Sequence, residues 1–278
     1  MKHLLTALLA CVLAACSAPH TRPDVATTAG SSDLRVVTLN IYHDKAEWPK
    51  RLPLIIEQLR ALDADVIALQ EVLQTADLPN QAQTLGDALG YSVQFVSTDP
   101  EGQPHRYGNA LLTRLPVLYR DWTALEPRAD SRTMGHARLQ VAGRPIDVYF
   151  THLHHTSEGA PLRRRQLQDG RTFMGRHDDG APALVLGDFN AAASAPELDA
   201  LDGFVDVYGA LHPDADARGV TTLNPHFFDE RRRIDHVFAE AGRFDLVEAR
   251  VVLDTPGTDG TWPSDHFGTF VVLRPTGR

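Results

Sequence analysis

Short apolar segments typical of β-strands recur along most of the chain, and few segments with helical spacing separate them. The strand-like segments cover residues 34–39, 65–69, 92–96, 109–112, 137–141, 146–151, 183–186, 234–238, 247–252 and 267–273. Helical spacing is found at 52–62 and 162–176. A doubly wound parallel sheet needs a helix between most successive strands. We therefore expect an α+β fold with two packed, mixed β-sheets.

Polar residues stand at the carboxyl ends of these apolar segments. Asn40 follows 34–39, Glu71 follows 66–70, His152 follows 148–151, and Asp188 and Asn190 follow 184–187. Strand ends meet at one rim of a sheet, where loops on a rigid scaffold carry functional residues. Two further positions extend the series, because Asp235 lies within 233–238 and the pair Asp265-His266 precedes the last strand. We expect all of these side chains to share one site.

The chemistry that fits this residue set is metal-assisted hydrolysis of a phosphate ester. Mg²⁺ prefers oxygen ligands, keeps several waters and needs only one or two carboxylates from the protein. Glu71 is the first candidate ligand, and Asp188, Asn40 and Asp265 are candidates for a second carboxylate, an amide oxygen or a water-mediated contact. Cysteine occurs only at positions 11 and 16, which makes zinc the less expected metal.

Two histidines are candidates for proton transfer. A carboxylate beside a histidine fixes its tautomer and stabilises its charged form. The sequence indicates His266 with Asp235 as such a pair. His152 is the second histidine, which would hydrogen-bond a phosphate oxygen or protonate the leaving oxygen.

A family resemblance covers roughly residues 33–273. The chain resembles the endonuclease/exonuclease/phosphatase superfamily in a set of motifs that occur in the same order: Leu39-Asn40, Leu69-Gln70-Glu71, the segment 108–114, Thr151-His152-Leu153, Gly187-Asp188-Phe189-Asn190, Ile234-Asp235-His236 and Ser264-Asp265-His266. Any one of these motifs could arise by chance, but the ordered set is specific.

The resemblance implies a four-layer α/β/β/α sandwich like that of deoxyribonuclease I, with the site between the two sheets at one end. It also implies Mg²⁺, with Mn²⁺ as a substitute, held by Glu71 with help from Asn40 and Asp265. Asp188 and Asn190 would position or activate the attacking water, or touch the metal and the phosphate. His266, oriented by Asp235, would be the general base, and His152 would lie across the phosphate from it.

Other residues near these motifs have less specific interpretations. Arg132 matches a position where some members of the superfamily place a phosphate-contacting arginine, and Asn109 is expected to support the substrate site from behind. His236 should point away from Asp235 on the same strand, which favours packing. Tyr107 is also read as a packing residue. His43, His105, His154 and His155 lie near motif ends and are left out of the catalytic set.

The first residues predict export and a lipid anchor. Lys2 precedes an apolar run at 4–15, which is too short to span a bilayer and is typical of a signal peptide. The sequence Leu13-Ala14-Ala15-Cys16 resembles a bacterial lipobox, with cleavage before Cys16 and lipidation of its sulfur. Residues 17–32 then read as a flexible tether, and the catalytic domain as 33–278. Ser17 after the cysteine favours the outer membrane, by resemblance to Gram-negative sorting.

Three functions follow as hypotheses from these features. The first is a phosphodiesterase acting on nucleic acid outside the cytoplasm, although a formal net charge of −9 disfavours unspecific polyanion binding. The second is a phospholipid or sphingolipid phosphodiesterase, or a phosphatase, for which 226–228 and 261–263 are the candidate membrane-facing loops. The third is a non-catalytic lipoprotein that binds at the cell surface. We expect the protein to contact the membrane only through its lipid anchor. No feature of the sequence indicates an obligatory partner protein.

Overall fold

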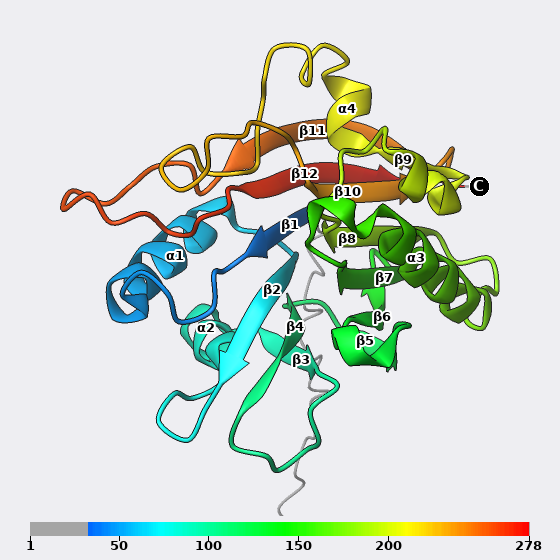
Figure 1. The fold of residues 1–278 in the computed structure, drawn as a ribbon. Coiled ribbons are helices and arrows are strands. Elements are labelled where there is room, and N and C mark those ends of the chain that lie inside the picture. The colour runs from blue at the N-terminus through cyan, green and yellow to red at the C-terminus, as the bar shows by residue number, and fades with distance from the viewer. Residues whose placement is uncertain (1–32, 278) are drawn as a thin grey trace, which may run out of the picture. The chain divides into compact units, whose positions relative to one another are not determined.

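The computed structural model describes residues 33–277, which form two six-stranded β-sheets with helices beside them (Figure 1). The expected signal peptide, Cys16 and the tether lie outside these residues. The first sheet has the order β11 (Phe244–Val252), β12 (Gly268–Pro275), β1 (Leu34–Asn40), β2 (Val66–Gln74), β4 (Arg106–Thr113) and β3 (Ser92–Val96). The second has the order β5 (Val117–Ala124), β6 (Thr133–Val141), β7 (Arg144–His152), β8 (Ala183–Asp188), β10 (Asp235–Glu240) and β9 (Phe204–Asp206).

Both sheets are mixed. In the first sheet β1 and β2 are parallel, and in the second β7 and β8 are parallel, while their other neighbours run antiparallel. Each parallel pair is joined through a helix, α1 (Trp48–Leu62) between β1 and β2 and α3 (Ala160–Gly175) between β7 and β8. Such a crossover is what a parallel pair requires.

Three apolar clusters separate the layers. One cluster fills the space between the sheets, with Val36 and Val66 from the first and Val148 and Leu186 from the second. A second cluster packs α1 and α2 (Gln81–Leu89) on the outer face of the first sheet, and a third packs α3 on the outer face of the second. The layers therefore follow the order α/β/β/α, and the predicted four-layer sandwich is confirmed.

Shorter helical segments complete the connections. They are α4 (Val207–Leu211) and the 3₁₀ turns Arg128–Asp130, Ser157–Gly159 and Pro196–Leu201. None of the helices within 33–277 has both the length and the apolar composition needed to cross a membrane.

All the predicted strands are present, several with extended ends, but α2, α4, β5 and β9 were not predicted. The side chain of Asn80 caps α2 by accepting a hydrogen bond from the Gln83 N–H, and this cap could have been recognised from the sequence. Gly86 obscures the helical pattern, yet a Cβ there would lie 2.3 Å from Val93 Cγ2, so the helix can approach β3 only with glycine. β5 is an edge strand whose Leu118, Tyr119 and Trp122 remain exposed, so it lacks the buried pattern used to find strands.

Candidate active site

The register of the second sheet places three of the predicted side chains side by side. His152 on β7 pairs with Asp188 on β8, and Asp188 pairs with Asp235 on β10. Residues directly opposite each other on neighbouring strands point to the same face. His152 Nε2 lies 3.4 Å from Asp188 Oδ2, and all three side chains are at most 2% exposed.

The first sheet supplies Asn40, which reaches across to the second. Its Nδ2 donates to Asp188 Oδ2 at 3.1 Å, while its Oδ1 accepts from the Tyr42 N–H at 3.0 Å. An amide oxygen has two lone pairs, so this bond still leaves room for a cation. Asn40 therefore orients Asp188 and remains compatible with the predicted metal contact.

The loop before β12 carries Asp265 and His266 into the same region. Ser264 Oγ donates to the backbone oxygen of Asn40 at 2.6 Å, which fixes this loop against the end of β1. His266 Nδ1 donates to Asp235 Oδ2 at 2.9 Å and lies 4.0 Å from Asp188 Oδ2. The predicted pair of His266 and Asp235 is thus formed.

The charges of this cluster perturb its proton equilibria. Burial alone lowers the pKa of His266, but the charge and hydrogen bond of Asp235, with the charges of Asp188 and Asp265, raise it to about 10. Burial and the charge of Asp235 raise the pKa of Asp188 to about 7. His152 has no carboxylate hydrogen bond of comparable strength, and burial lowers its pKa well below the ordinary value. The site therefore favours a charged His266 and a neutral His152.

The donor set fits a hard divalent cation. Asp188, Asp235 and His266 each offer a ligand atom within 4.8 Å of the other two. Burial and the charge of Glu71 raise the pKa of Asp265 to about 6, although the charge of His266 opposes this effect, so negative charge is crowded at this site. Oxygen donors that carry excess negative charge are what Mg²⁺ or Mn²⁺ selects.

Glu71 lies at an irregularity in β2. The pairing of β2 with β4 shifts between Leu69 and Val72, and Glu71 adopts a φ of 58°. A non-glycine residue in the left-handed region at a bulge is typical of a redirected side chain at a functional site. Its carboxylate is 21% exposed, in contrast to the buried acids of the second sheet, which leaves it accessible as a ligand.

The remaining predicted residues surround this cluster. The Asn190 N–H donates to Asp188 Oδ1 at 2.9 Å, and its side-chain nitrogen donates to the Leu153 carbonyl at 3.1 Å. Asn109 Nδ2 donates to Thr133 Oγ1 at 3.0 Å. Arg132 Nη2 lies 3.3 Å from His155 Nδ1, and the charge of Arg132 lowers the pKa of His152 after the larger effect of burial. Arg132 is therefore near enough to attract a phosphate bound at the site.

Two packing interpretations have different outcomes. His236 is buried against Phe189 and Phe238, and its Nε2 lies 3.0 Å from the Ala191 oxygen, so the packing interpretation is confirmed. Tyr107, which we read as a packing residue, instead lies beside Glu71. Burial, and then the charge of Glu71, raise the pKa of Tyr107. The alternation of β4 places Tyr107 and Asn109 on one face and is the sequence signal that could have found it.

Sequence reasoning also missed Arg51, which is 1% exposed in the first turn of α1. Its guanidinium donates to the carbonyls of Lys45, Ile41, Tyr42, His43 and Pro263 at 2.7–3.1 Å. Burial lowers its pKa to about 10, which still leaves it charged at neutral pH. Arg51 thereby joins the loop after Asn40 to the loop before Asp265.

Replacing Arg51 with Ala is expected to lower the free energy of unfolding by about 3–5 kcal/mol, because several buried carbonyls lose their donor. Arg51→Lys should recover only part of this loss, since an ammonium group cannot match the planar fork of a guanidinium. Urea denaturation measures both effects. Arg60→Ala, on the exposed face of the same helix, removes one exposed hydrogen bond to the Ala88 carbonyl and is the matched control, and an equal loss in the control would contradict the role of Arg51.

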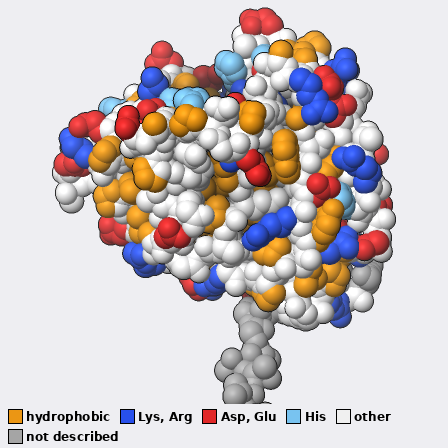
Figure 2. All heavy atoms as spheres, turned by 90° about the horizontal axis from the view of Figure 1, so that it is seen from below, with side chains coloured by type: hydrophobic (Ala, Val, Ile, Leu, Met, Phe, Trp, Pro, Cys, Tyr) orange, Lys and Arg blue, Asp and Glu red, His pale blue; other side chains and the backbone are white. Residues whose placement is uncertain are grey.

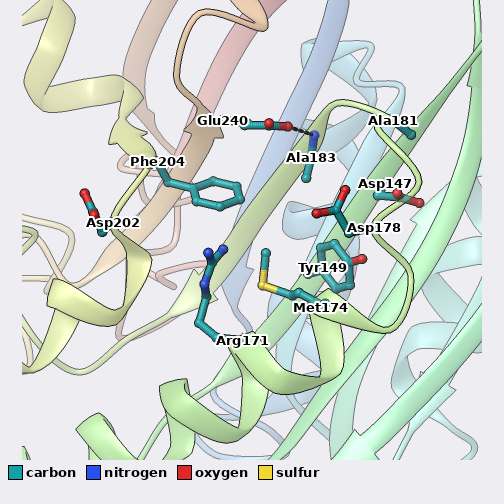
Figure 3. Close-up of a pocket in the computed structure, with 12 residues that line it drawn as sticks. Asp147, Tyr149, Arg171, Met174, Asp178, Ala181, Ala183, Asp202, Phe204 and Glu240 are labelled. Atoms are coloured by element: carbon teal, nitrogen blue, oxygen red, sulfur yellow. Dashed lines mark hydrogen bonds between the residues drawn. The ribbon is translucent and has the colours of Figure 1, made fainter.

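A separate cavity of about 200 Å³ lies away from these residues (Figure 3). Asp147 and Ala183, near the amino ends of β7 and β8, line it together with Tyr149, Arg171 and Phe204. His152 and Asp188 stand at the opposite ends of the same strands, so the cavity and the candidate active site are distinct. On the face drawn in Figure 2, Lys and Arg side chains are dispersed among acidic and apolar ones, and His side chains gather along the upper edge.

Known structures share the fold of this chain. The human Nocturnin catalytic domain with bound sulfate superposes with a TM-score of 0.72 at 20% identity, covering 88% of this chain and 95% of that one. D. rerio TDP2 complexed with a single-strand DNA product gives 0.73 at 17% identity, covering 87% and 99%. An endonuclease/exonuclease/phosphatase from Beutenbergia cavernae gives 0.65 at 23% identity, covering 88% and 72%. No curated protein matches the chain.

The model of the Endonuclease/Exonuclease/phosphatase family matches residues 37–266, a span that begins in β1 and ends at His266. It therefore contains every residue that the structure brings together around Asp188, and the expected resemblance is confirmed. The chain belongs to the Endonuclease/Exonuclease/phosphatase family.

Proposed function

We propose that this protein is a Mg²⁺-dependent phosphodiesterase that hydrolyses nucleic acid outside the cytoplasm, anchored by lipid at Cys16. The observation that carries the hydrolytic part is the buried row of His152, Asp188 and Asp235, completed by Asn40 and His266. The choice of nucleic acid is supported by the fold shared with TDP2, whose structure holds a single-strand DNA product. The apolar run before Cys16 supports export.

The geometry and the proton equilibria of the site support a separate catalytic role for each of these residues. Asp188, whose Oδ2 lies within reach of Asn40 Nδ2 and His152 Nε2, is the proposed base that takes a proton from the attacking water. This reverses the first hypothesis for His266, whose raised pKa favours the imidazolium form. His266 would then stabilise or protonate a phosphate oxygen while Asp235 holds its ring. Neutral His152 would donate a hydrogen bond, and Arg132 would attract the phosphate.

A divalent cation, when bound, would neutralise charge on the phosphate oxygens. Glu71, Asp265 and Asn40 are the residues that would hold it. Mn²⁺ would substitute for Mg²⁺, because both ions accept carboxylate and amide oxygens.

A second candidate function has one specific observation in its favour. The two aromatic loops singled out in the sequence lie together, with His226 and Trp262 ring centroids 6.0 Å apart, and Phe227 is 37% exposed beside Tyr42. Exposed aromatic side chains near a catalytic site suit a lipid interface. The same rings could stack on bases, which is why nucleic acid remains the first proposal.

A substrate panel tests the proposal. The purified protein is incubated with plasmid, RNA, sphingomyelin, phosphoinositides and a bis-aryl phosphate, each with Mg²⁺ and with a chelator. We expect nicking of a polynucleotide that the chelator abolishes. Cleavage of a lipid alone would replace the first proposal with the second. If Asp188→Asn and His266→Ala both kept every measured function, a non-catalytic binding protein would be favoured instead.

The stabilisation by Mg²⁺ is expected to grow with pH. The pKa values of Asp188 and Asp265, about 7 and 6, exceed their unfolded values, so the metal-free folded state binds more protons between pH 7 and 4. On account of these groups, the metal-free protein becomes more stable as the pH falls through that window. A cation must displace those protons. We therefore expect the increase in Tm on adding Mg²⁺ to be large at pH 8 and small at pH 5.

Thermal denaturation with and without Mg²⁺ at each pH measures this difference. Asp265→Asn should flatten the pH dependence of the metal effect, whereas Asp254→Asn, on an exposed loop, should leave it unchanged. A metal effect on Tm that is equal at pH 5 and pH 8 would contradict the expectation.

A further inference from the structure

The loop 41–47, between β1 and α1, holds an unusual backbone. Tyr42, His43, Ala46 and Glu47 all have φ between 28° and 59°. Non-glycine residues in this region are strained and persist only where the surrounding structure fixes them. Contacts with the surrounding structure must therefore hold this loop in its conformation.

Two buried side chains fix the loop against β2. The His43 carbonyl accepts from Arg51 Nη2 and from Gln81 Nε2, both at 2.7 Å. Gln81 Oε1 accepts from the Leu73 N–H at 2.9 Å, two residues beyond Glu71 on the same strand. Through Gln81, the position of His43 is locked to the strand that carries Glu71.

The imidazole of His43 is oriented as well as its backbone. Its Nδ1 lies 2.8 Å from Asp44 Oδ1, and its ring makes edge contacts with the rings of Tyr42 and Tyr107. A carboxylate on one ring nitrogen fixes the tautomer so that the other nitrogen presents a lone pair, which is the usual arrangement behind a metal-binding histidine.

The free side of the ring points at Glu71. His43 Nε2 lies 4.0 Å from Glu71 Oε2. That separation is too long for a hydrogen bond. It is also shorter than twice a metal–ligand distance of about 2.1 Å, so one cation between the two atoms could contact both.

We infer that His43 is a nitrogen ligand of the divalent cation held by Glu71, with Asp44 as its orienting partner. This inference rests on the proposed metal-dependent function and adds a residue that the sequence analysis set aside. Imidazole is a better ligand for first-row transition ions than for Mg²⁺. The site would therefore bind Mn²⁺ more tightly than an all-oxygen site would, and would prefer it over Mg²⁺.

The experiment uses Mn²⁺ alone as the probe, with the purified metal-free protein and no substrate. Electron paramagnetic resonance gives the affinity from the signal of unbound Mn²⁺, and electron spin echo modulation detects a coordinated imidazole nitrogen. We expect the wild-type protein to show the nitrogen modulation. His43→Ala should lose it and bind Mn²⁺ at least about 10-fold more weakly. Mg²⁺ affinity, measured by calorimetry, should fall by a smaller factor.

Asp44→Asn and His212→Asn complete the set. Asp44→Asn retains the imidazole, so it should keep the nitrogen modulation and weaken Mn²⁺ binding less than His43→Ala. His212→Asn removes a ring just after α4 that bonds to the Ala249 carbonyl, and should change neither quantity. Circular dichroism establishes that each variant is folded.

The other outcomes also decide the matter. Bound Mn²⁺ without nitrogen modulation, or modulation that persists in His43→Ala and disappears in His266→Asn, would refute the role of His43 and leave the proposed function standing. Failure of the wild-type protein to bind either ion would overturn both. A failed substrate assay with normal Mn²⁺ binding would affect only the proposed function.

Discussion

Asp188→Asn is expected to reduce kcat/KM by a factor of roughly 10³–10⁴ with the fold intact, if the protein cleaves a phosphodiester as proposed. The carboxylate is the shared acceptor of the site, since its Oδ2 faces Asn40 Nδ2, His152 Nε2 and His266 Nδ1. An amide at this position would either present a nitrogen to those donors or turn its nitrogen toward the Asn190 N–H. It would also remove the carboxylate that is proposed as the base.

Initial rates on the substrate identified by the panel measure this effect, with kcat and KM determined separately. Asp199→Asn, in the turn after β8 and outside the cluster, is the matched control and should keep the wild-type rate. If Asp188→Asn retained more than about a tenth of the wild-type kcat, water activation by Asp188 would be excluded.

Glu71→Gln is expected to weaken divalent-metal binding by at least about 100-fold and to lower activity at ordinary Mg²⁺ concentration by a similar factor. The substitution keeps the size of the side chain and removes its charge, which is the main contribution of a carboxylate to a magnesium site. Because Glu71 is partly exposed at a bulge, the change should cost little stability. Raising the metal concentration should restore part of the activity.

Calorimetric titration of Mg²⁺ and of Mn²⁺ tests this expectation. Glu57→Gln, on the exposed face of α1, makes the same chemical change away from the site and should bind both ions normally. Unchanged affinity in Glu71→Gln would move the metal site to the cluster of Asp188, Asp235 and His266, which the geometry also allows.

Much of the fold and site could be predicted because both depend on local patterns. Apolar strands that end in a polar residue locate His152 and Asp188, and the parallel pairing of β7 with β8 then brings them into register. Asp235 arrives on an antiparallel neighbour, and its place in the row follows from the same alternation that turns His236 into the core.

The residues that were missed depend on tertiary contacts that no local pattern records. Arg51 stands just before the predicted helix 52–62 as an ordinary charged residue, and only the folded loop 41–45, together with the return of the chain at Pro263, surrounds it with carbonyls. His43 reads as a surface histidine, since its relation to Glu71 is set by Gln81, on a helix that was itself not predicted. The role now proposed for His266 differs from the one first expected, because the charges of Asp188 and Asp265 add to that of Asp235.

Strand β12 lies between β11 and β1 in the first sheet. One of the two neighbours of β1 is therefore β12, which comes after all the other strands in the described sequence. The loop that brings Asp265 and His266 to Asn40 immediately precedes that strand. During synthesis, a nascent chain that has not yet reached this loop contains Asn40 and Asp188 but lacks His266, which completes the cluster. The cluster around Asp188 can therefore assemble only after the segment that precedes β12 has been synthesised.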